Sequence, residues 1–363
     1  MSHANSYSYT FAALRGMQAG RTFYVAMCPL RLIPKLFLFD EDELPAQLRA
    51  QRPLNRARIP SITRYMLDNP NEYVFSSITA SVDGDVRFDP AFPDSSLGNL
   101  VISMAAKFII NDGQHRRAAI EAAICENSDL GNETISVVLF QDGGLRRSQQ
   151  MFADLNQYAI RPTTAIGILY DVRSPLAQLA RSLVESVHVF KNLTESERTS
   201  ISHRSIKLFT LSSIHQGTKS LLGKRGIDDV TSEESALAAR FWNAVAKYIP
   251  EWQLAAEKKA NPSELRREFV HAHGIALHSI GLMGAALIKQ APNSWTTKLE
   301  GLSTIDWSRR NVAIWEGRAL VSGRISKATT NVALTSSLLK RALGLSLTKE
   351  EQRLENRLRG NAQ

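Results

Sequence analysis

The hydrophobic pattern of the chain changes near residue 173, and this change constrains the fold more than any other feature. Before it, short β-rich runs at 22–27, 108–110 and 135–140 alternate with helical segments. After it, apolar residues recur at three- and four-residue spacing over 175–191, 197–222, 232–258 and 264–288. The sequence therefore predicts an α+β protein, with a mixed α/β domain over 1–170 and a mainly α-helical domain over 171–363.

Local turn chemistry adds detail to the first domain. Pro60 near the start of the apolar stretch 61–67 predicts a helix. The β-rich run 73–81 followed by Asp83-Gly84-Asp85 predicts a strand and a hairpin turn.

The charge balance narrows the class of partner. Lys and Arg number 44 against 35 Asp and Glu, a net charge of +9, which favours polyanions and nucleic acid above all. No signal peptide and no run of about 18 apolar residues is evident, so we expect a cytoplasmic protein without a membrane segment. Two cysteines, Cys28 and Cys125, exclude a disulfide framework and suit a reducing compartment.

Two basic stretches are candidates for contacting DNA phosphates. Five arginines lie between 49 and 64 without an acidic residue, and three of them are DNA-binding candidates: Arg56, Arg58 and Arg64. A solvated helix face paired with the acidic residues 40–43 is the alternative. Seven basic residues and one acidic residue lie between 309 and 341, and the candidates there are Arg309, Arg310, Arg318, Arg324 and Lys327. Trp307 and Trp315 within this stretch are expected to be core residues more than base-stacking platforms.

The most specific local feature is a strand, a glycine turn and a helix start at 108–120. Such a turn presents free backbone N–H groups to an anion, and Gly113 lets a phosphate approach. Gln114, Arg116 and Arg117 are the other phosphate- or nucleotide-binding candidates. Asp112 can cap the helix or hold a metal, and His115 can transfer a proton. An ordinary Asp-Gly turn with solvated arginines explains the same residues.

This stretch carries a resemblance to a known family. Residues 112–116, DGQHR, are letter for letter the signature of the DNA sulfur-modification protein B family, DndB. Residues 20–34, 152–163, 315–318 and 323–327 resemble further blocks of that family in the same order. Among these residues, Asp154, Asn156 and Arg161 are family-motif candidates, and Cys28 is a regulatory candidate. A buried, inert thiol is the plainer interpretation of Cys28.

The resemblance implies a DNA-binding negative transcriptional regulator of the bacterial DNA phosphorothioation operon. Its expected partners are promoter duplex DNA, other phosphorothioation proteins and, in a homo-oligomer, copies of itself. The signature domain is also similar to ParB and sulfiredoxin folds, which leaves an alternative: a nucleotide-binding switch, or an enzyme that hydrolyses nucleoside triphosphate or nicks DNA. ATP or CTP with Mg²⁺ would be the cofactor, with Asp112 and His115 as catalytic residues. His271, His273 and His278 lack the partners of a metal centre, so no metal site is expected.

Overall fold

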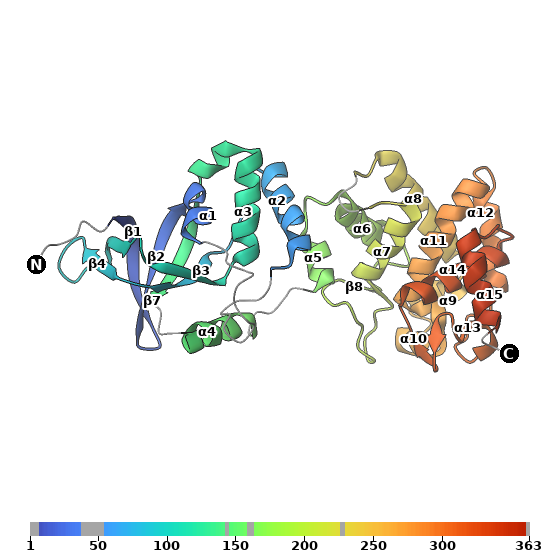
Figure 1. Cartoon of the computed structure of the whole chain (residues 1–363). Helices are drawn as coiled ribbons and strands as arrows, with labels where there is room; N and C mark the ends of the chain where they lie inside the picture. Colours follow the sequence, from blue (N-terminus) through green and yellow to red (C-terminus); the bar gives the residue numbers. More distant parts are fainter. Residues whose placement is uncertain (1–6, 38–53, 142–144, 158–162, 226–228, 361–363) are drawn as a thin grey trace, which may run out of the picture. The chain divides into compact units, whose positions relative to one another are not determined.

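A computed structural model describes residues 7–37, 54–141, 145–157, 163–225 and 229–360. Contacts within the chain divide it into two compact units, Met1–Ile160 and Arg161–Gln363. Figure 1 draws the first in blue to green and the second in green to red. The sequence places a boundary after residue 170, whereas helix α5 (Thr164–Tyr170) groups with the second unit. The chain is an α+β protein with a mixed sheet and many helices.

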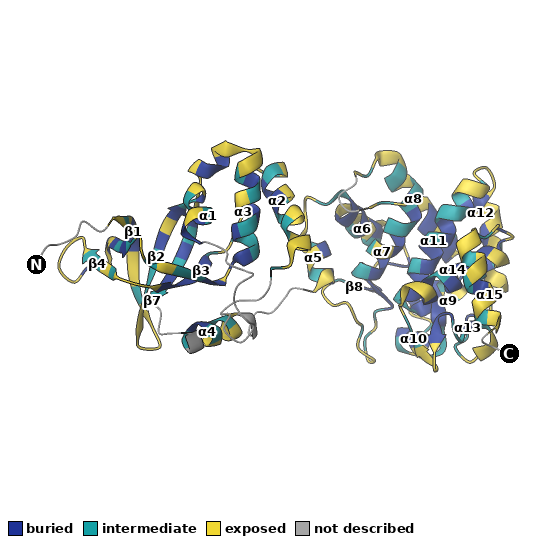
Figure 2. Cartoon of the chain, in the orientation of Figure 1, coloured by how far each residue is buried: buried dark blue, intermediate teal, exposed yellow. Residues whose placement is uncertain are grey.

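The first unit is built on a seven-stranded sheet in the order β4-β5-β1-β2-β7-β3-β6. Its strands are β1 (Ser8–Gln18), β2 (Arg21–Pro29), β3 (Ile78–Asp83), β4 (Val86–Pro90), β5 (Leu97–Ser103), β6 (Lys107–Asp112) and β7 (Thr134–Gln141). Neighbouring strands run antiparallel, except that β3 and β7 are parallel. Along β7 every second residue is buried, which is the alternation of a strand with one face on the core (Figure 2).

The sheet curls until its two ends approach each other. Strand β4 forms one edge and β3 lies beside the other, yet only Gly84 and Asp85 join them. The carbonyl of Asp85 accepts a hydrogen bond from the N–H of Ser103 at 3.1 Å, and a Cβ on Gly84 would lie 2.6 Å from the Cβ of Ala106. The predicted hairpin is therefore wrong, because this turn passes between the ends of the sheet and does not pair β3 with β4.

Within the described residues, the α-helices of the first unit are α1 (Ile33–Leu36), α2 (Ile59–Asp68), α3 (Gln114–Glu126) and α4 (Leu145–Gln157). Helix α3 packs against α1, α2 and β3, and α4 contacts β6. The core between sheet and helices is continuous and includes Phe37, Met66, Ile78 and Ile120. The strand and helix predicted on either side of Gly113 are confirmed as β6 and α3.

The second unit is a helical assembly around α11 (Gly274–Gln290). Within the described residues, the other α-helices of this unit are α5, α6 (Pro175–Ser186), α7 (Leu211–Leu222), α8 (Ser232–Ala246), α9 (Pro250–Ala256), α10 (Pro262–Glu268), α12 (Trp295–Lys298), α13 (Val312–Trp315), α14 (Thr329–Ala342) and α15 (Lys349–Gly360). Helix α11 packs between α7 and α14. A Cβ on Gly281 would collide with the carbonyl of Gly217, so these glycines let α7 and α11 approach at backbone distance. Within the described residues, no helix is long and apolar enough to cross a membrane.

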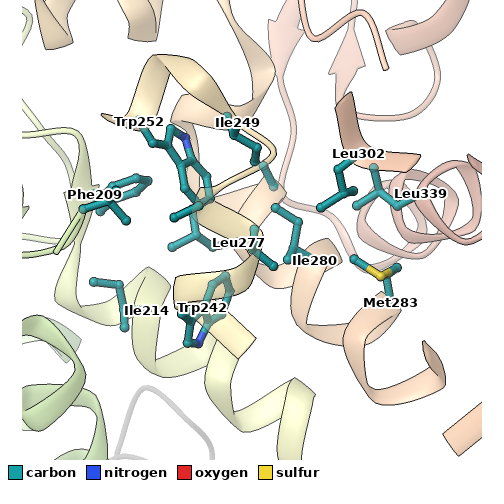
Figure 3. Close-up of a cluster of buried hydrophobic side chains, with 14 of the residues drawn as sticks. Phe209, Ile214, Trp242, Ile249, Trp252, Leu277, Ile280, Met283, Leu302 and Leu339 are labelled. Carbon is teal, nitrogen blue, oxygen red and sulfur yellow. The ribbon is translucent and has the colours of Figure 1, made fainter. Parts of the chain in front are cut away.

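Tryptophans anchor the core of this unit. Trp242 and Trp252 lie beside Leu277 and Ile280 of α11 (Figure 3). Trp307 and Trp315 stack on each other inside the unit, with ring centroids 5.4 Å apart, so the expectation that they are core residues is confirmed.

Two predicted helices are shorter than the sequence suggests. Of the segment 197–222, only Leu211–Leu222 is helical, and the preceding residues pass through the short parallel strands β8 (Thr194–Glu195) and β9 (Phe209–Thr210). The carboxylate of Glu195 accepts from the N–H groups of Glu197 and Arg198, which diverts them from a helix. The segment 264–288 is broken by the 3₁₀ turn η5 (Val270–Ala272), so His271 lies outside α11. The last strands, β10 (Leu320–Val321) and β11 (Arg324–Ile325), form a small hairpin.

Candidate nucleic-acid interface and the signature turn

The signature turn, residues 112–117, connects the end of β6 to the start of α3 through Gly113 alone. Gly113 has φ +110°, a left-handed conformation that residues with a Cβ rarely adopt. A Cβ there would lie 3.0 Å from Ile78 and 3.1 Å from the guanidinium of Arg116. The glycine is thus required by the backbone and by its neighbours.

The guanidinium of Arg116 is bound within the fold. It forms an ion pair with Asp112 at 2.7 Å, donates to the hydroxyl of Ser76 at 2.7 Å and donates to the carbonyl of Ser77 at 3.0 Å. These contacts join the segment before β3 to the start of α3. Asp112 is in turn neutralised by Arg116, so its carboxylate needs no metal ion to be satisfied.

Arg117 points into the protein. Its side chain is buried and donates to the carbonyls of Phe37 at 2.9 Å and Pro34 at 3.1 Å, and it also pairs with Glu121. We therefore assign Arg117 a structural role and no phosphate contact. Gln114 is also buried, and its amide nitrogen has no hydrogen-bond partner among the described residues.

These contacts do not fit a nucleotide clamp. The two guanidinium groups that would hold its phosphates are bound to protein atoms, and the space beside Gly113 is taken by Ile78 and Arg116. Among the described residues, no group of three or more His, Cys, Asp or Glu side chains is arranged to hold a metal ion.

His115 connects the signature turn to the first basic stretch. The N–H of Asn55 donates to Nε2 of His115 at 3.2 Å, so Asn55 is held against the start of α3. Asn55 itself caps the 3₁₀ turn η3 (Arg56–Arg58), because its side-chain oxygen accepts from the N–H of Ala57 at 3.2 Å. Helix α2 follows directly and packs on α3.

Residues 55–64, the arginine segment, present three predicted DNA-binding residues at the surface. Arg56, Arg58 and Arg64 are all exposed. Within the described residues, no carboxylate forms an ion pair with Arg58 or Arg64. The predicted Arg49 and Arg52 of the same basic stretch lie outside the described residues.

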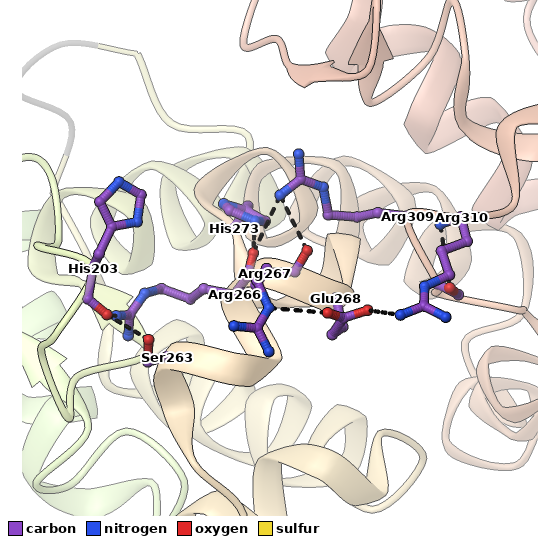
Figure 4. A network of polar contacts seen from close by, with 9 residues as sticks. His203, Ser263, Arg266, Arg267, Glu268, His273, Arg309 and Arg310 are labelled. Carbon is purple, nitrogen blue, oxygen red and sulfur yellow. Dashed lines mark hydrogen bonds and ion pairs between the residues drawn. The ribbon is translucent and has the colours of Figure 1, made fainter.

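The second basic stretch divides into surface and interior residues. Arg310 is exposed and pairs with Glu268 at 3.0 Å, as does Arg267 on the other carboxylate oxygen (Figure 4). Arg324 is exposed on β11. Arg309 is half-buried and donates to the carbonyls of Arg266, Arg267 and Gly323 at 3.4, 3.3 and 3.1 Å.

Arg318, which the sequence groups with these surface cations, lies inside the helical unit. Its guanidinium forms a bidentate pair with Glu355 of α15, with one bond at 2.8 Å, and donates to the carbonyl of Leu334 at 3.0 Å. Glu355 is only 1% exposed. A DNA contact by Arg318 is thus not compatible with this conformation, because its donors stabilise the fold.

The remaining predicted site residues are also partly buried and partly at the surface. Cys28 is buried in the core of the sheet, and desolvation raises the pKa of its thiol to about 12, which gives no support to a redox role. Asp154 is exposed on α4 and accepts from Gln150 at 2.7 Å. Asn156 is in α4, but its side chain lies outside the described residues, as does Arg161.

Sequence reasoning missed a polar network in the helical unit. Arg266 is buried and donates to the carbonyls of Ser202, His203 and Ser205 at 2.9, 3.3 and 3.0 Å. His273 contacts the carbonyl of Arg266 at 2.7 Å, and burial lowers the pKa of its imidazole to about 4 (Figure 4). The sequence feature that could have indicated this network is the pair of adjacent arginines, Arg266 and Arg267, in a short helix capped by Asn261.

Comparison with known proteins identifies the family. Neither curated proteins nor solved structures gave a match to the chain. The family model DndB, described as DNA-sulfur modification-associated, matches residues 11–346. The match covers both units and includes the signature turn. The chain therefore belongs to the DndB family of proteins associated with DNA sulfur modification.

Proposed function

We propose that this protein is a DNA-binding negative transcriptional regulator of the DNA phosphorothioation operon. The family's association with DNA sulfur modification supports the pathway. The net charge of +9 supports a polyanionic partner. The first unit acts as the DGQHR domain of the ParB and sulfiredoxin type, and the protein works in the cytoplasm beside other phosphorothioation proteins.

The observation that carries the proposal is the arginine segment on its fixed support. Arg58 and Arg64 are exposed and have no acidic partner among the described residues. Asn55 binds His115, and α2 packs on α3, so the segment is held by ordered elements. Exposed arginines on a rigid support suit contacts with successive DNA phosphates, since less side-chain and backbone freedom is lost on binding. Arg310 and Arg324 add positive charge in the second unit.

Fluorescence anisotropy with the operon's own promoter duplex tests the proposal. The test variant is Arg58→Ala with Arg64→Ala. The control is Arg87→Ala, because Arg87 is exposed on β4 and already pairs with Asp89 at 3.0 Å. Each lost phosphate contact reduces the slope of log K against log salt by about 0.9. We expect the double variant to bind more weakly with a slope smaller by about 1.8, two such contacts, while the control matches the wild type.

Regulation needs a second measurement. Loss of the protein should raise transcription from the operon promoter, and the double arginine variant should fail to restore repression. Promoter binding that is insensitive to salt, or a double variant that binds and represses like the wild type, would contradict the proposal.

A further inference from the structure

A recess in the helical unit is lined by residues of that unit alone. Its volume is about 480 Å³, within the range of pockets that hold small ligands. Its walls come from the loop at 199–203, the N-terminal ends of α7 and α11, the end of α10, and the side chains of Arg309 and Lys327. Every one of these residues belongs to the second unit.

The recess is strongly cationic. Arg266, Arg267, Arg309 and Lys327 line it, and its described lining includes no Asp or Glu. Arg267 is the one of the four that forms an ion pair within the described residues, with Glu268. Arg266 and Arg309 donate to backbone carbonyls alone, which satisfies hydrogen bonds but leaves their positive charge uncompensated.

Lys327 is the most available of these cations. Within the described residues, its ammonium has no hydrogen bond and no ion pair. Lys327 is exposed and lines the recess. The surrounding protein partly desolvates the ammonium and lowers its pKa. Burial also lowers the pKa of Arg266. An anion in the recess would relieve both of these unfavourable charge environments.

The N-terminal end of α11 adds donors to the same wall. His273 at the N-cap makes no side-chain bond to the first amides of this long helix. Gly274, the first residue, leaves the wall open: a Cβ there would lie 3.0 Å from Nζ of Lys327 and would overlap the hydroxyl of Ser213. Ser213 and Thr210 share a hydrogen bond of 2.5 Å at the start of α7, and both residues line the recess. Hydroxyls, helix amides and cations together are the donor set of phosphate sites.

The geometry points to this recess as a binding site for the phosphoryl group of a small phosphorylated molecule of mononucleotide size. The phosphoryl group binds between Lys327, Arg309 and the N-terminal end of α11, and the organic part contacts Ile201 and Leu277. A concave recess suits a small ligand better than a duplex, whose phosphates lie on a convex surface. This inference is independent of the proposed DNA binding, because it involves none of the arginine segment.

Calorimetric titration of the full-length protein tests the site. The probes are pyrophosphate, AMP and ATP, with adenosine as the probe that lacks a phosphoryl group. Lys327→Met removes the unpaired charge without breaking any hydrogen bond or ion pair within the described residues. Lys289→Met is the matched control, since Lys289 is exposed near the far end of α11. We expect at least one phosphorylated probe to bind, adenosine to bind more weakly, and Lys327→Met to lower affinity about tenfold or more, as loss of a charged hydrogen bond does.

Gly274→Ala provides a second variant, because its Cβ fills the space between Ser213 and Lys327 and should also weaken binding. Tryptophan fluorescence checks that this variant is folded. The proposal is overturned when no phosphorylated probe binds the wild type, or when Lys327→Met binds as the wild type does. It is also overturned when Lys327→Met reduces the salt dependence of promoter binding while no small probe binds, since the recess would then contact a DNA phosphate. The arginine-segment variants test the proposed DNA binding separately. Their effect on promoter binding does not change the conclusion about the recess.

Discussion

Replacing Arg318 should destabilise the helical unit, because the buried carboxylate of Glu355 loses its main charged partner. In Arg318→Met, Arg341 at 3.4 Å is the one charged partner that Glu355 keeps among the described residues, and its carboxylate remains in the interior with 2% of its side chain exposed. The carbonyl of Leu334 also loses the additional hydrogen bond that Arg318 donates. Removing one member of a buried ion pair costs about 3–5 kcal/mol. Because Arg341 remains, we expect the lower end, about 3 kcal/mol.

The expected change in the melting temperature follows from this loss of stability and from the size of the unit. For 150–250 residues, 1 kcal/mol corresponds to about 2–4 °C, so Arg318→Met should lower Tm by about 6–12 °C. Tryptophan fluorescence reports the unfolding of the second unit, because all five tryptophans of the chain lie there: Trp242, Trp252, Trp295, Trp307 and Trp315. Arg310→Met is the control, since it removes an exposed pair with Glu268 that contributes little to stability.

A double variant separates the orphaned charge from lost packing. Arg318→Met with Glu355→Leu removes both charges and should recover most of the stability, because apolar residues of similar volume replace buried ion pairs at little cost. A single variant that melts within about 2 °C of the wild type would refute the reasoning. So would a double variant that is no more stable than the single one.

Three further predictions follow from groups in both units. Burial lowers the pKa of His271 to about 3 and that of His273 to about 4. Below about pH 6.5 the unfolded chain therefore binds protons that the folded chain does not, and urea midpoints of the helical unit should fall steadily towards pH 4. Gly113→Ala should cost about 1–2 kcal/mol or more for the left-handed conformation, seen as faster hydrogen exchange in α3. A thiol reagent followed by mass spectrometry should label exposed Cys125 in the native protein and Cys28 only after unfolding.

The sequence predicts elements well where their cause is local. The strand, glycine and helix around Gly113 follow from composition and turn chemistry within a few residues. The turn at 83–85 has the same local signal as a hairpin, yet its strands find partners elsewhere because strand pairing is set by contacts distant in sequence, such as the parallel pairing of β3 with β7. No periodicity argument contains that information.

The sequence also does not show which charged residues of the candidate site are at the surface. Arginines in a basic stretch look alike in sequence, but Arg58 is exposed, whereas Arg318 is paired in the interior. The difference depends on Glu355, a residue of the last helix that has no sequence relation to the basic stretch. The cationic recess was missed for a related reason, because its donors come from several segments between 199 and 327 and form no contiguous motif.

The order of strands in the sheet has a consequence for folding during synthesis. The strands β1 and β2 pair with each other, but β1 also pairs with β5 and β2 with β7, and β7 ends only at Gln141. Closing such distant pairs is slow compared with forming helices from nearby residues. While the ribosome translates the intervening segment, both edges of the hairpin remain unpaired and open to wrong strands. Until β7 has left the exit tunnel, the first unit is therefore the part of the nascent chain most exposed to wrong strand pairing.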